Sequence, residues 1–191
     1  VDWVKRRFKA DGHDIDSEEA RYLIFLCGDL MNGLISEIGK ISAYAKHHRV
    51  TREDIDAVAT PQLDAVVFQM TDAIALKDFN RAALVLGDLF HMQEAPIKLL
   101  SVLGRQLRQL YAARLALEAR KGTGYLMELW GMRSAYPAEK LMQSARRFSL
   151  AWCRRAVIRC GEIDLAMKST GADGEELLTQ LLLELAGPGA A

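Results

Sequence analysis

Apolar residues recur at spacings of three and four through almost the whole of this 191-residue chain. That spacing places them on one side of an α-helix, which has 3.6 residues per turn. A long, clean alternation of apolar and polar residues, which is typical of a half-buried strand, does not occur in the sequence. The sequence therefore predicts an all-α fold. Half of its residues are hydrophobic, which is enough for one compact domain with a small satellite.

Breaks in the apolar pattern divide the chain into a series of predicted helices. Asp16 or Ser17 caps the first clear helix, and Gly28 ends it. Thr51 is the expected cap of a later helix, with Asp54 as its acidic partner three residues further on. The predicted helices span residues 17–27, 29–45, 51–58, 63–76, 78–92, 96–120, 125–130, 137–147, 148–168 and 174–186.

The second of these helices illustrates how side chains are assigned to faces. Its apolar stripe, which we expect to be buried, consists of Leu30, Leu34, Ile38 and Ile41. Glu37 and Lys40 lie three residues apart on its side and predict an ion pair that serves packing and orientation rather than a reaction.

A boundary between two domains is predicted at residues 58–61. Thr60 precedes Pro61, and a residue before proline avoids helical geometry. We expect a small helical domain in residues 1–58 and a larger helical bundle in residues 59–191. The chain starts at Val1 within an amphipathic run, Trp3 to Phe8, which suggests that it was cut from a longer protein.

Several chemistries are missing from the sequence. It has no Walker-type phosphate loop, and Gly122-Thr123-Gly124 reads as a helix stop, so neither a nucleotide nor another cofactor is expected. Cys27, Cys153 and Cys160 form no CxxC pair and read as buried hydrophobes rather than a metal site. With no membrane-spanning run and no signal peptide, we expect a soluble, cytoplasmic protein with no membrane partner.

The charges are unevenly distributed although the formal net charge is zero. Residues 98–159 carry 13 basic and 3 acidic side chains, a band of +10 between acidic flanks. Such a band predicts contact with DNA or with an acidic partner, or is the solvated face of long helices. The candidate contact residues within it are Arg105, Arg108, Tyr111 and Arg114, because Tyr111 is the one aromatic residue in basic company.

Several motifs, in order along the chain, together resemble one family. The segment Ile15 to Tyr44 contains a Gly28-Asp29-Leu30 turn followed by Leu34, Glu37, Lys40 and Tyr44. The later motifs are Val50 to Ile55, Phe68 to Ile74, Glu94 to Leu100, Arg105 to Arg108, Asp164 to Lys168 and the leucines of residues 177–183. Their order and spacing resemble the delta subunit of the bacterial DNA polymerase III clamp loader, with Ile41 in place of the usual Leu.

This resemblance implies a non-catalytic assembly piece. Residues 1–58 would be the lid domain and residues 59–191 the collar, without the ATPase-like N-terminal domain that binds the sliding clamp. The implied partners are the gamma or tau subunits and delta-prime, with primed DNA as a further ligand inside the complex. For Arg105 and Arg108 we favour a protein partner over DNA, since the acidic flanks would repel phosphates.

Two other classes of function are less consistent with the sequence. A helical adaptor or scaffold would be favoured by repeats of 30 to 45 residues, which are not found. A helical enzyme with buried carboxylates would need paired Glu/Asp-x-x-His motifs, and these are also missing.

Overall fold

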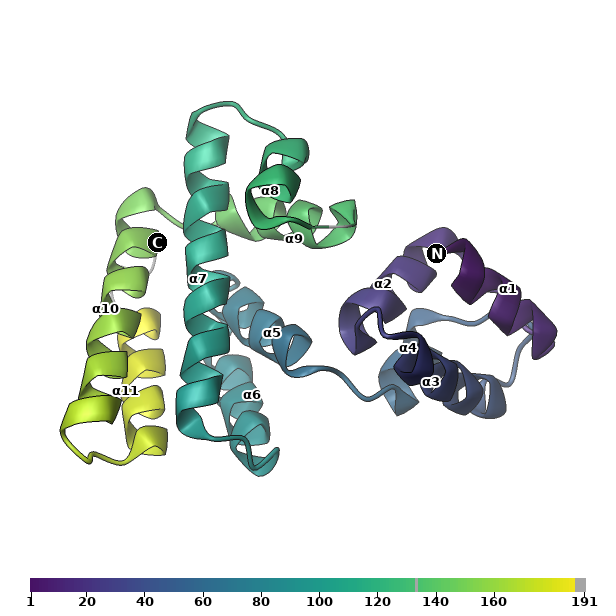
Figure 1. Ribbon diagram of the computed structural model, residues 1–191, viewed down its shortest axis with the longest axis horizontal. Coiled ribbons are helices and arrows are strands. Elements are labelled where there is room, and N and C mark those ends of the chain that lie inside the picture. Colours follow the sequence, from purple (N-terminus) through teal and green to yellow (C-terminus); the bar gives the residue numbers. More distant parts are fainter. Residues whose placement is uncertain (133, 188–191) are drawn as a thin grey trace. The chain divides into compact units, whose positions relative to one another are not determined.

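The computed structural model describes residues 1–132 and 134–187, and Figure 1 shows the course of the chain. Every regular element in these residues is a helix, which confirms the predicted all-α fold. The helices are α1 (Asp2–Ala10), α2 (Ser17–Cys27), α3 (Met31–Tyr44), α4 (Arg52–Val58), α5 (Leu63–Ala75), α6 (Phe79–His91), α7 (Pro96–Glu118), α8 (Thr123–Trp130), α9 (Ala135–Ala145), α10 (Leu150–Ser169) and α11 (Gly174–Ala186).

The predicted helix ends agree with these bounds to within a few residues, with two exceptions of note. The run at Trp3 to Phe8, which the sequence marked only as amphipathic, forms α1 and buries Val4 and Phe8. Leu30 was expected on the buried stripe of α3, and that expectation is wrong. The helix begins at Met31, so Leu30 is its N-cap and is 71% exposed.

The chain divides into two units, which we call unit 1 (Val1–Ala65) and unit 2 (Val66–Ala191). The expected boundary at residues 58–61 falls in the connection between α4 and α5. The division between the units falls slightly later, in the first turn of α5.

Unit 1 is a small bundle of α1 to α4 around one apolar core. Its most deeply buried side chains are Phe8, Leu23, Ile38, Ile41 and Ile55. The Thr51 hydroxyl accepts a hydrogen bond from the Asp54 backbone N–H while the Asp54 carboxylate accepts one from Thr51, which confirms the predicted cap of α4. Gly28 ends α2 with φ +84°, a conformation that favours glycine.

The connections of unit 1 are held by polar side chains. The predicted pair of Glu37 and Lys40 is present, with Lys40 Nζ 2.8 Å from Glu37 Oε2. The same two side chains also hold Thr60: its backbone N–H donates to Glu37, and its hydroxyl accepts a hydrogen bond from Lys40. Because Thr60 lies between α4 and α5, the pair fixes the exit of the chain from unit 1.

Unit 2 is built around α7, the longest helix. Figure 1 shows α7 running between α10 on one side and α8 and α9 on the other. The stripe of α7 that includes Leu103, Leu107 and Leu110 is buried against these neighbours. The leucine-rich pattern of the C-terminal helix α11 predicts an apolar face, and the helix buries Leu178, Leu181, Leu182 and Leu185 while Leu177 is half-buried.

Among the described residues, no single helix is long and apolar enough to cross a membrane. Helices α2 and α3 reach the required length and composition only as a pair, with a bend of 120° between them, and both contribute to the core of unit 1.

Candidate functional site

The four residues predicted as contacts, Arg105, Arg108, Tyr111 and Arg114, all lie on α7. Three residues turn a helix through about 300°, so each step in this series moves the side chain about 60° around the axis. After three steps, Arg114 is on the opposite side of the helix from Arg105. The structure exposes Arg105 and Arg108 and leaves Tyr111 and Arg114 half-buried.

Arg114 is occupied within unit 2. One guanidinium nitrogen lies 3.4 Å from Glu118 one turn further along α7, and its Nε atom is buried without a hydrogen-bond partner among the described residues. Burial raises the pKa of Cys153 on α10 to about 11, and the positive charge of Arg114 opposes that rise. Arg114 therefore packs between α7 and α10, where its aliphatic stem covers apolar surface.

Arg108 lies beside a groove of about 420 Å³ between α7 and α10. Gly104 and Gly161 keep the groove open because neither has a side chain, and Asp164 lies on its α10 wall. The Arg108 side chain has no ion pair or hydrogen bond with any described residue. Its guanidinium is thus available to a group outside the chain.

An apolar groove between α7 and α8 was not found by the sequence reasoning. It has a volume of about 320 Å³ and is lined by Leu115, Tyr125 and Leu129, with Lys121 at its edge. The three apolar side chains are 43%, 45% and 52% exposed. Leu115 lies off the buried stripe of α7, which is the signal that identifies such a position in the sequence.

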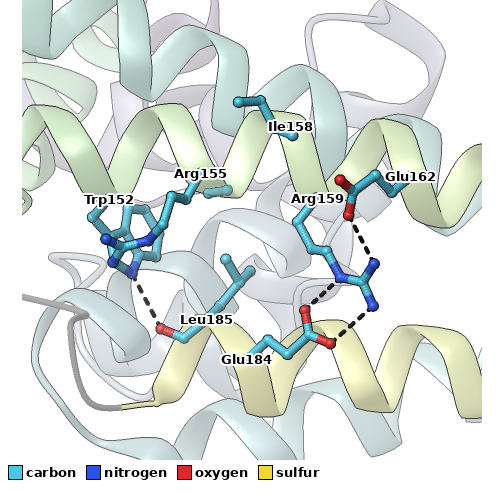
Figure 2. Close-up of a pocket in the computed structure, with 8 residues that line it drawn as sticks. Trp152, Arg155, Ile158, Arg159, Glu162, Glu184 and Leu185 are labelled. Carbon is cyan, nitrogen blue, oxygen red and sulfur yellow. Dashed lines mark hydrogen bonds and ion pairs between the residues drawn. The ribbon is translucent and has the colours of Figure 1, made fainter.

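Figure 2 shows how α11 is held against α10. The Arg159 guanidinium donates two hydrogen bonds to Glu184 on α11, of 2.5 and 2.9 Å, and one of 2.8 Å to Glu162. The Trp152 indole N–H donates to the Leu185 carbonyl near the end of α11. The hydrogen bonds between Arg159 and Glu184 raise the pKa of Arg159 and lower the pKa of the Glu184 carboxyl. They fix the C-terminal helix rather than form a reaction centre.

The cysteines and histidines do not gather into a site. All three cysteines are buried, as predicted, and burial raises the pKa of Cys27 and Cys160 to about 12 each. At neutral pH such thiols carry no reactive thiolate. Among the described residues, no group of three or more His, Cys, Asp or Glu side chains could hold a metal ion.

Comparison with known proteins decides the family. The family model described as the DNA polymerase III delta subunit, C-terminal domain, matches residues 64–185, which is more than half of the chain. The chain belongs to the DNA polymerase III delta subunit family. This membership confirms the family inferred from the order of the sequence motifs.

Relatives of this family match nearly the whole chain at low identity. A probable DNA polymerase III subunit delta from Aquifex aeolicus is 24% identical over 181 residues, and a DNA polymerase III subunit delta from Bacillus subtilis is 22% identical over 186. These matches cover 94% and 97% of this chain but 52% and 53% of the relatives. The chain therefore spans about half the length of the relatives that it matches.

A solved structure shares the fold. The Bacillus subtilis DNA clamp loader delta protein superimposes with a TM-score of 0.79 at 21% identity. The match covers 97% of this chain and 55% of that chain, so it includes both units.

Proposed function

We propose that this chain is the lid and collar part of a clamp-loader delta subunit, with residues 1–58 as the lid and residues 59–191 as the collar. Its role is assembly: the collar joins the gamma or tau subunits and delta-prime so that the intact subunit opens the sliding clamp for loading onto primed DNA. The observation that carries the proposal is the family match over residues 64–185. That match also favours a role in replication over a helical adaptor of unrelated function.

The surface of unit 2 supports a role in assembly. The groove lined by Leu115, Tyr125 and Leu129 exposes three large apolar side chains together, which is the composition of the centre of a protein interface. Its proposed occupant is the collar domain of a neighbouring subunit, since a relative of the same fold is named a clamp-loader protein. Arg105 and Arg108 are exposed on α7, nearer its N-terminal end than Leu115, and would contact an acidic part of the same assembly.

The proposed role is not enzymatic. The sequence has no phosphate loop to hold ATP, so the energy for clamp loading would come from the ATPase subunits of the complex. The sliding clamp would be contacted by the N-terminal domain of the intact subunit. A role in replication would place the protein in the bacterial cytoplasm.

The proposal can be tested by mixing the chain with gamma and delta-prime and measuring the mass of the complex by light scattering. We expect one copy of the chain in a stable complex. Changing Leu129→Glu should weaken assembly at least about tenfold, because a carboxylate would be buried in an apolar interface. Circular dichroism should be unchanged, since Leu129 is 52% exposed.

The matched control is Leu30→Glu, the same change at a site in unit 1 that is 71% exposed. It should assemble like the unchanged chain. Failure of the unchanged chain to join the complex would contradict the assembly role. Equal assembly of both variants would leave that role standing but show that the groove between α7 and α8 is not the contact.

A further inference from the structure

Four arginines lie close together where α9 leads into α10. Arg146 and Arg147 follow the last turn of α9, and Arg154 and Arg155 lie in the first two turns of α10. All four are exposed. We call these four residues the arginine corner. Between residues 135 and 155 the sequence has five basic side chains and one acidic side chain, Glu139, so the local charge is positive.

The chain geometry keeps the four side chains within reach of one another. Ser149 caps α10 by accepting a hydrogen bond from the Trp152 backbone N–H, which fixes the turn between the two pairs of arginines. Two linking residues and one turn of helix separate Arg147 from Arg154, so their Cα atoms are at most about 17 Å apart. The arginines are thus near enough to one another to contact the same stretch of a nucleic-acid strand.

Three of the four arginine side chains have no partner among the residues that the structure describes. The guanidinium groups of Arg146, Arg147 and Arg154 make no hydrogen bond or ion pair with any of those residues. By contrast, Arg114 and Arg159 on the neighbouring surface are paired with carboxylates. An anion from outside can therefore bind the three without first breaking an internal ion pair.

The corner lacks the cluster of apolar side chains that a protein interface has at its centre. The one exposed large hydrophobic side chain within a turn of its arginines is Ile158, among the described residues, whereas Leu115, Tyr125 and Leu129 form a cluster on the groove between α7 and α8. Protein interfaces bury aromatic and aliphatic anchors at their centre. A phosphate backbone requires only positive charge and hydrogen-bond donors.

We infer that the arginine corner binds the phosphate backbone of a nucleic acid, without reading its sequence. Arginine fits this ligand because its planar guanidinium donates two parallel hydrogen bonds to one phosphate and stays charged at all physiological pH values. The site is separate from Arg105 and Arg108, which we assign to subunit assembly. It goes beyond the proposed assembly role, because it gives the chain a nucleic-acid contact of its own.

The test uses the whole chain and a fluorescently labelled DNA duplex with a single-stranded overhang, titrated from about 50 to about 200 mM salt. The triple variant Arg146→Ala, Arg147→Ala, Arg154→Ala should bind at least about tenfold more weakly at the lowest salt. The slope of log affinity against log salt should fall by about 2 to 3, because each lost contact to duplex phosphate removes about 0.9.

The matched control removes three exposed basic side chains from unit 1: Arg6→Ala, Lys9→Ala, Lys46→Ala. It changes the net charge by the same amount and should leave both affinity and slope nearly unchanged. Equal losses in the two variants would overturn the inference, because they would show a general charge effect. No DNA binding by the unchanged chain would overturn it too.

Assembly with gamma and delta-prime, measured on the same variants, separates this inference from the proposed function. We expect the arginine-corner variant to assemble normally. If it loses assembly and keeps DNA binding, the corner binds an acidic protein surface, and the inference is wrong. If the unchanged chain binds DNA at the corner but never assembles, the inference holds and the proposed function fails.

Discussion

The two units use their charged residues differently. In unit 1, residues 1–65 carry 12 acidic and 9 basic side chains, and several of these form contacts between elements that are far apart in the sequence. Arg52 binds Glu19, Arg49 binds Asp16, and the Tyr22 hydroxyl donates to Asp56. In unit 2, several ion pairs join residues only one turn apart on the same helix: Glu94 with Lys98, Arg114 with Glu118, and Asp164 with Lys168.

This difference explains why free positive charge accumulates in unit 2. A small unit has little apolar surface to bury, so polar contacts contribute more to holding its connections. Unit 2 has long helices and an apolar seam along α7, and among its basic side chains Arg159 joins two helices by pairing with Glu184. The side chains of four others have no hydrogen-bond or ion-pair partner among the described residues and are available for contacts outside the chain: Arg108, Arg146, Arg147 and Arg154. The paired charges of unit 1 thus stabilise that unit itself, whereas several exposed arginines of unit 2 stabilise no helix contact within it.

The largest effect should follow from a cavity in the seam of unit 2. Leu107 on α7 is 1% exposed, so Leu107→Ala removes buried methyl groups and should cost about 2–5 kcal/mol of unfolding free energy. Urea unfolding, together with alkylation of the buried thiols Cys153 and Cys160 on α10, reports the loss.

Leu115→Ala is the matched control on the same helix, because Leu115 is 43% exposed. It should cost less than about 1 kcal/mol. Equal losses for the two changes would contradict the picture of a seam that runs along one side of α7.

A smaller loss of unfolding free energy should distinguish the paired arginine Arg52 of unit 1 from the unpaired Arg154 of unit 2. The Arg52 guanidinium binds Glu19 through two nitrogens and lies 3.7 Å from the centre of the Tyr22 ring. Arg52→Ala should therefore destabilise unit 1 by about 1 kcal/mol, and the loss should shrink as salt rises. Alkylation of Cys27, the buried thiol of unit 1, measures it.

The comparison change is Arg154→Ala in unit 2. Since Arg154 has no partner in the described part of the chain, its removal should alter stability by less than about 0.5 kcal/mol. If Arg154→Ala lowered the free energy of unfolding as much as Arg52→Ala, paired and unpaired arginines would contribute equally to stability, and the proposed difference between the two units would be wrong.

The fold was predictable from the sequence where a local rule decides the structure. Apolar spacing, the Thr51 and Asp54 cap, and Gly28 at the end of α2 each act over a few residues, and the structure has all of them. Leu30 was misplaced because spacing alone cannot say on which residue a helix starts. The order of the motifs also sufficed to identify the family.

The contact surfaces were less predictable, for a different reason. The four residues Arg105, Arg108, Tyr111 and Arg114 are near one another in sequence, but which of them are exposed depends on how α10 packs on α7. The groove between α7 and α8 likewise depends on how two helices meet across a loop. A charge count locates a basic band, and only the fold distinguishes its paired arginines from its free ones.

The smallest effect concerns the one inter-helix ion pair of unit 2 that Figure 2 shows, between Arg159 and Glu184. The Arg159 hydrogen bonds lower the pKa of Glu184 in the folded protein. A carboxyl group whose pKa is lower when folded adds stability above its unfolded pKa, and that stability is lost as pH falls through the folded pKa. Because both side chains are about a third exposed, solvent screening keeps the contribution below about 1 kcal/mol.

Glu184→Gln should thus destabilise the protein slightly at pH 7 and make no difference in strong acid. Urea unfolding across this pH range measures the effect, with Glu128→Gln, an exposed site on α8, as the control that should show none. A Glu184 effect that persisted unchanged into strong acid would mean that packing, rather than charge, holds α11 against α10.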